Sequence, residues 1–294
     1  MFLCYNSCMK RLTLIFSILF LVNQSVFAAE TENKFLQAIK NIPQKIAIRT
    51  VIKEQTKFSK KYDLNGLATL YSENFESSDA FNKEVYFKLI DDTWKSYPDI
   101  TYTTKINKIK IDGDKASVEV DETALATATQ IDKDITVYGE LNSISEGTYY
   151  LKKENDKWKF IGEKVDNEKS ILKYGDTRYI KMDLSSPKLV KPNEYYTATL
   201  TVDTPSDALV IASICRDKIV YPQEKMDEVY RKMPDDNILE RMFLANKNGK
   251  NEYNIASVGL TKSRENSLGK LEVYMAGVAF IMVRVNVEGV CDGK

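Results

Sequence analysis

The spacing of apolar residues changes near Pro98, and no other feature of the sequence constrains the fold as strongly. Before Pro98 apolar side chains recur at helical intervals, whereas after it they alternate with polar ones, as in half-buried strands. Residues 44–62 and 80–97 are predicted to be helices, with a short helix capped by Asp63 between them. The first half therefore runs from helices into strands, which predicts an α+β fold.

The first predicted helix carries an apolar stripe that also contains one amide side chain. Its members are Ile46, Ile48, Val51, Ile52, Gln55, Phe58 and Tyr62. A stripe of this kind packs against the rest of the domain, so this helix is expected to cover the strands that follow.

A meander of four or more long antiparallel strands is predicted to complete the first half. The turn at Asp112–Asp114 joins the first two strands. In the second strand Val118 and Val120 alternate with Glu119 and Asp121, so the valines and the acids lie on opposite faces. Burying the acids and exposing the valines would cost more free energy than the reverse, which argues against catalysis by these two carboxylates.

Three local sequences of the first half carry a family resemblance. They are YDLNGLATLY at 62–71, IKIDGDKASV at 109–118, and YLKK at 150–153 with KWKF at 157–160. Over about residues 44–166 the chain resembles the nuclear transport factor 2-like superfamily, which includes SnoaL-like and ketosteroid-isomerase-like proteins. The resemblance implies a cone-shaped domain of three helices on a curved antiparallel sheet, and a homodimer formed through the outer face of that sheet.

Enzymes of this superfamily move a proton with a carboxylate and hold the oxyanion with a tyrosine or a protonated acid. The resemblance makes Glu119, Asp121, Tyr138 and Glu140 the nearest candidates here, but members of the SnoaL-like and dehydratase-like groups often use a histidine. This chain contains none. A non-enzymatic role is therefore favoured.

An apolar pocket in the cone is the predicted binding site. Its candidate lining residues are Tyr86, Trp94, Tyr102, Tyr138 and Tyr150, with Tyr149 and Trp158 in the same wider aromatic set. The alternative is that these rings are ordinary core packing, because large aromatic side chains fill cores routinely.

The second half is predicted to be a separate all-β domain. A charged, weakly periodic linker is expected at 167–178, and short strands separated by turns fill residues 179–294, which is typical of a β-sandwich of immunoglobulin-like type. Cys215 and Cys291 are expected to form a disulfide, because the chain is predicted to be exported and disulfides persist in oxidising compartments. The alternative is two buried thiols.

The N-terminal segment reads as a targeting sequence. Lys10 and Arg11 precede an apolar run of 11 residues from Leu12 to Val22, too short for a bilayer span, which takes about 20 residues. Residues 1–28 are therefore predicted to be a signal peptide cleaved after Ala28, followed by a helical lead-in at 29–43. The mature chain is expected in the periplasm or outside the cell, without a membrane span; a short membrane anchor is the alternative.

Composition excludes several classes of function. The formal net charge is zero, with 42 basic and 42 acidic residues, which argues against nucleic-acid binding. The absence of histidine excludes Ser-His-Asp and Cys-His catalysis and HExxH zinc sites. No P-loop, GxGxxG, CxxC or EF-hand sequence occurs, so no cofactor or metal is predicted.

We therefore predict an exported module that binds a small apolar ligand or a protein partner of the cell envelope. The alternatives are a cofactor-free isomerase, cyclase or dehydratase acting in the cone pocket, and an envelope scaffold or adhesin-like protein. An enzyme needs a buried acid of raised pKa in the pocket, a binding module needs a pocket without one, and a scaffold needs neither.

Overall fold

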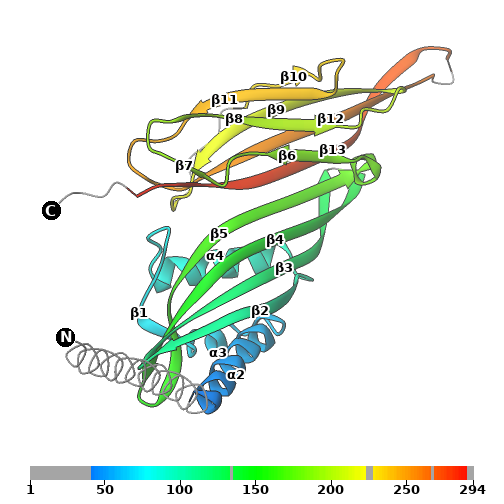
Figure 1. Cartoon of the computed structure of the whole chain (residues 1–294). Coiled ribbons are helices and arrows are strands. Elements are labelled where there is room, and N and C mark those ends of the chain that lie inside the picture. The colour runs from blue at the N-terminus through cyan, green and yellow to red at the C-terminus, as the bar shows by residue number, and fades with distance from the viewer. Residues whose placement is uncertain (1–40, 133–134, 223–227, 266–267, 290–294) are drawn as a thin grey trace, which may run out of the picture. The chain divides into compact units, whose positions relative to one another are not determined.

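The computed structural model describes residues 41–132, 135–222, 228–265 and 268–289 (Figure 1). The predicted signal peptide and Cys291 lie outside these ranges, as does the predicted lead-in except for residues 41–43. The chain divides after Thr50 into two compact units, and of the first only the start of a helix is described. Among the described residues, no helix is both long enough and apolar enough to cross a membrane.

Three helices are formed close to their predicted positions. They are α2 (Ile42–Ser59), α3 (Leu64–Ala68) and α4 (Lys83–Ser96). The Asp63 carboxylate caps α3 as predicted, accepting a hydrogen bond from the Gly66 amide at 2.8 Å. The Asn82 side chain caps α4 by accepting from the Val85 amide at 3.0 Å. Two of the predicted helix starts thus rest on local hydrogen bonds.

The predicted meander is present as four long antiparallel strands. They are β2 (Thr101–Asp112), β3 (Lys115–Asp132), β4 (Ile135–Glu154) and β5 (Lys157–Gly175). Hydrogen bonds hold the helices against this sheet, from Gln55 in α2 to Tyr149 and from Trp94 in α4 to Tyr102. A further strand, β1 (Tyr71–Ser77), pairs with β5 in parallel. The helices therefore cover the sheet face that also carries Val118 and Val120, which are 0% and 3% exposed.

The large sheet continues from the first half of the chain into the second. Strand β13 (Leu271–Val287) pairs with β5 from Val283 opposite Lys169 to Gly277 opposite Gly175. One ten-stranded sheet therefore runs β10-β9-β12-β13-β5-β4-β3-β2, with β1 and β7 off this path. The predicted linker at 167–178 forms the end of β5 and the short helix η1 (Asp176–Tyr179). Its periodicity is weak because β5 is paired on both edges and half-buried on both faces.

The remaining strands of the second half enclose one core. The large sheet contributes β9 (Ala208–Lys218), β10 (Arg231–Lys232), β12 (Glu252–Glu265) and β13, and a second sheet has the order β11-β8-β6. The bounds of the others are β6 Met182–Ser185, β7 Leu189–Val190, β8 Tyr195–Val202 and β11 Ile238–Leu244. Side chains of both sheets form a single buried cluster, in which Leu200, Val258 and Ile281 are almost fully enclosed.

A close backbone approach at two glycines joins β5 to β13. Gly175 has a φ of +60°, and a Cβ on Gly277 would lie 2.6 Å from the Tyr174 carbonyl oxygen. The register of β12 and β13 shifts beside Gly277, which indicates a β-bulge there. Only glycine fits both positions, so the turn out of β5 fixes where β13 pairs.

A buried ion pair connects the loop before α4 with β13. Arg284, which is 1% exposed, donates to the Asp79 carboxylate at 2.6 Å, and Asn251 donates to the same carboxylate at 2.7 Å. Arg284 also donates to Asn286 at 2.8 Å. These bonds satisfy a charge that is out of contact with water and hold the loop between β1 and α4 in place.

Replacement of Arg284 by Ala is expected to lower the free energy of unfolding by about 3–5 kcal/mol, because Asp79 would stay buried without its cation. Arg264→Ala is the matched control, since its ion pair with Glu272 is exposed and such pairs contribute at most about 1 kcal/mol. Urea unfolding of the two variants measures the difference. Equal losses in both would contradict the structural role of the buried pair.

Candidate functional site

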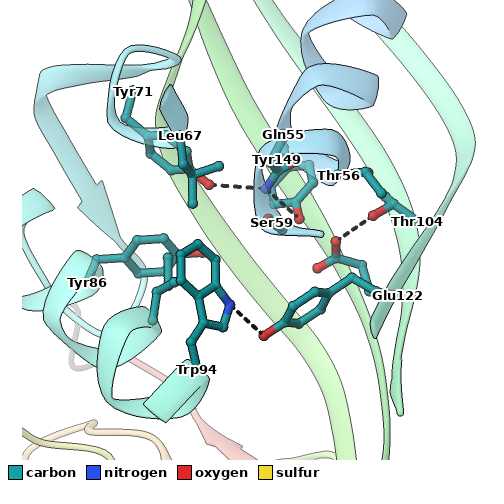
Figure 2. A pocket seen from close by; sticks show the side chains of 12 residues that line it. Gln55, Thr56, Ser59, Leu67, Tyr71, Tyr86, Trp94, Thr104, Glu122 and Tyr149 are labelled. Atoms are coloured by element: carbon teal, nitrogen blue, oxygen red, sulfur yellow. Dashed lines mark hydrogen bonds between the residues drawn. The ribbon is translucent and has the colours of Figure 1, made fainter. Parts of the chain in front are cut away.

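A cavity of about 110 Å³ lies between the helices and the sheet (Figure 2). Its lining side chains come from α2, α3, β1, α4 and strands β2–β4, and most are aromatic or polar. They are Gln55, Thr56, Ser59, Leu67, Tyr71, Tyr86, Ile90, Trp94, Tyr102, Thr104, Glu122 and Tyr149.

Gln55 is the most unusual of these side chains, because it is 9% exposed and incompletely bonded. Its Nε2 donates to the Tyr71 hydroxyl at 3.1 Å and to the Tyr149 hydroxyl at 3.3 Å. Its Oε1 is buried without a hydrogen-bond partner among the described residues. A buried polar atom of this kind costs free energy unless a partner reaches it, so it marks a place for a hydrogen-bond donor.

Glu122 faces the same cavity from β3. The Thr104 hydroxyl donates to its carboxylate at 2.9 Å (Figure 2). Burial raises the pKa of Glu122, and hydrogen bonds from Tyr149 and Thr104 oppose that rise in pKa. Because the Tyr149 proton is directed to this carboxylate, the Tyr149 oxygen is free to accept from Gln55.

A second, half-buried acid is bonded to Tyr86. The Tyr86 hydroxyl donates to the Glu163 carboxylate at 2.7 Å. Burial raises the pKa of Glu163 to about 8, partly opposed by that hydrogen bond. Burial also raises the pKa of Tyr71, Tyr86 and Tyr149 above the ordinary tyrosine value, so all three hydroxyls keep their protons near neutral pH.

The structure places three of the five predicted pocket residues in this cavity: Tyr86, Trp94 and Tyr102. The other two lie elsewhere, with Tyr138 63% exposed and Tyr150 40% exposed. Tyr150 alternates with the buried Tyr149 and Leu151 along β4, so it points to the opposite face of the sheet.

The acids singled out from the sequence are on the surface. Glu119 lies 3.8 Å from Lys110, and Asp121 lies 3.2 Å from Lys105. Glu140 approaches Arg178 at 3.5 Å. This agrees with the face assignment made from Val118 and Val120.

Sequence reasoning did not single out Gln55, Tyr71, Glu122 or Glu163 as site residues. Glu122 could have been identified from the sequence, because it lies two residues after Val120 and therefore on the same buried face of the strand as Val118 and Val120. The cavity combines neutral hydroxyls, one unpartnered amide oxygen and one buried carboxyl, a set that suits a neutral hydrogen-bonding molecule. In the part of the chain that the structure describes, no cluster of three or more acidic, cysteine or histidine side chains is placed to hold a metal ion.

Comparison with known proteins finds partial structural likeness. No family model matches the chain, and no curated protein matches it. A protein of Novosphingobium aromaticivorans assigned as a scytalone dehydratase is 18% identical with a TM-score of 0.36, over 44% of this chain and 86% of that one. An NTF2-like family protein of Streptomyces avermitilis, assigned as a dehydratase, is 10% identical with a TM-score of 0.31, over 41% and 93%.

Bd1075 of Bdellovibrio bacteriovorus is 18% identical with a TM-score of 0.31; the match spans 40% of this chain and 38% of the length of Bd1075. Each of these three matches covers 40–44% of this chain.

The Glu163 carboxyl makes a pH dependence of stability predictable. Its pKa is about 8 in the folded chain and about 4.5 when free, so between these values the folded state binds more protons. Its contribution to stability is therefore full below about pH 4.5 and is lost as the pH rises through about 8. Glu163→Gln keeps an acceptor for Tyr86 and is expected to gain stability relative to wild type as the pH rises across this window.

Thermal unfolding of both proteins across this pH window measures that difference. Glu119→Gln, at an exposed position, is the control and should follow the wild-type curve. A Glu163→Gln curve parallel to that of the wild type would show that Glu163 titrates normally.

Proposed function

We propose that this chain binds a small, largely apolar, neutral molecule that donates a hydrogen bond to Gln55 Oε1. The observation that carries the proposal is the buried amide oxygen without a partner, in a cavity walled by aromatic rings. The rings of Tyr86, Trp94 and Tyr102 offer apolar faces, and the raised pKa of Glu122 favours its uncharged form. A neutral ligand suits such a site better than an ion, because burying a charge there would cost more free energy.

Native mass spectrometry of the exported chain, beside the same sample denatured, tests this proposal. We expect extra mass that is lost on denaturation and that identifies the ligand. Gln55→Met keeps the side-chain volume but removes the acceptor, so the ligand should bind roughly 5- to 150-fold more weakly. Glu54→Met, at the exposed neighbouring position of α2, is the matched control and should bind as the wild type does. Unchanged binding to Gln55→Met would overturn the assigned acceptor.

The proposed place of action is the periplasm or the cell exterior, on the strength of Lys10, Arg11 and the apolar run that follows them. The denatured mass in the same experiment bears on this part, because cleavage leaves a chain that begins at Ala29. A further loss of two hydrogen atoms in that mass would mean that Cys215 and Cys291 are joined. Cys215 is buried in β9, and Cys291 lies outside the described residues, so the disulfide stays a prediction.

Cofactor-free proton transfer is the second candidate function, favoured by Glu122. Its carboxyl lines the cavity and has a raised pKa, as a general acid or base in such a site requires. Incubating the identified ligand with the protein in deuterium oxide separates the two candidates. Binding alone leaves the ligand unlabelled, which is the expected result. Deuterium at a ligand carbon, absent with Glu122→Gln, would establish proton transfer instead.

A further inference from the structure

A second, larger cavity of about 510 Å³ lies beside the first one. Strands β3, β4 and β5, the end of α4 and strand β13 form its walls. Its apolar lining includes Ile100, Ala124, Leu141, Leu172, Phe280 and Met282. This cavity opens to solvent, and apart from Ile100 its lining side chains are half-buried or exposed, so its apolar walls are accessible to a ligand.

Strand β13 contributes to this cavity because its two faces have different neighbours. Ala279, Ile281 and Val283 alternate into the core of the second half. Phe280 and Met282 lie on the opposite face, where Phe280 pairs with Leu172 and Met282 pairs with Ser170 of β5. The pairing of β13 with β5 therefore builds a wall that the first half does not supply by itself.

Three polar side chains of the larger cavity have hydrogen-bond partners within the protein. The Ser170 hydroxyl donates to the Ser143 hydroxyl at 2.8 Å, and the Thr93 hydroxyl donates to the Leu89 carbonyl at 2.8 Å. The Glu168 carboxylate accepts from the Tyr253 hydroxyl at 2.7 Å. These bonds hold the three side chains in place, and the apolar side chains make up most of the remaining wall.

Two rings line both cavities: Tyr86 and Tyr102. Each is held by its hydroxyl, since Tyr86 donates to Glu163 at 2.7 Å and Tyr102 accepts from Trp94 Nε1 at 3.2 Å. The two cavities are thus neighbours across a pair of fixed aromatic side chains. Ligand pockets usually measure about 300–1,000 Å³, and the smaller cavity alone falls below that range.

We infer that the two cavities form one site for an amphipathic molecule, with a hydroxyl or N–H head at Gln55 and an apolar tail against Leu172, Phe280 and Met282. This inference rests on the proposed function for the head and adds the tail cavity and the ligand class. It also gives the second half a direct part in binding, through β13.

A series of straight-chain alcohols from butanol to decanol, titrated calorimetrically into the full chain, tests the inference. Each methylene buried in the tail cavity should tighten binding about fourfold until the cavity is filled. Met282→Trp and Leu172→Trp place a ring in the tail cavity, so they should remove this gain with chain length. Met275→Trp, on the same strand but 53% exposed and outside both cavities, should behave as the wild type does.

Each outcome bears on one part of the site. Affinity independent of chain length in the wild type would overturn the tail cavity, as would a tryptophan variant that folds with an unchanged series. Thermal unfolding identifies any variant that does not fold, and the two tryptophan positions are independent of each other. Gln55→Met should weaken every alcohol by the same factor. A chain-length gain that persists while Gln55→Met has no effect would overturn the proposed function and leave the tail cavity standing.

Discussion

The pairing of β13 with β5 is the contact on which the rest of the molecule depends. It joins residues more than 100 positions apart in the sequence and makes one sheet of strands from both halves. It also gives β13 two buried or half-buried faces, one in the core of the second half and one beside the cavities of the first. Outside the predicted signal peptide, the longest apolar run of the chain, Met275–Val283, falls on this strand, as expected for a strand with neighbours on both faces.

Polarity is distributed unevenly along the face that the helices cover. Gln55 and Glu122 line the smaller cavity, and Glu163 is bonded to Tyr86, which also lines it. Each hydrogen bond there offsets the free-energy cost of taking a polar group out of water. The larger cavity carries Leu172, Phe280 and Met282 instead. A polar network that is almost fully bonded is rigid, so it fixes the positions of the few groups that remain available to a ligand.

The local elements of the first half followed from the sequence because local rules determine them. Asp63 capped a helix as expected, and the alternation of Val118 with Glu119 identified the buried face of β3. The join between the halves did not follow, because strand pairing over long range leaves no local signal, and the charged residues at 166–173 resemble a linker. The site was missed for a related reason: Gln55 was part of an otherwise apolar helical stripe, yet only the tertiary structure shows its amide meeting two tyrosines.

The hydrogen bonds of the smaller cavity limit which of its groups can act on a ligand. A tyrosine can stabilise an oxyanion only with a proton that it has not already given away. Tyr86 gives its proton to Glu163, Tyr149 is bonded to Glu122, and Gln55 Nε2 is shared between Tyr71 and Tyr149. Gln55 Oε1 is left over as an acceptor, and the Tyr71 and Tyr102 hydroxyls, which accept from Gln55 and Trp94, are left over as donors. Binding a hydroxyl or an N–H group at Gln55 Oε1 therefore needs no rearrangement of the network, and an oxyanion would have to be held by Tyr71 or Tyr102.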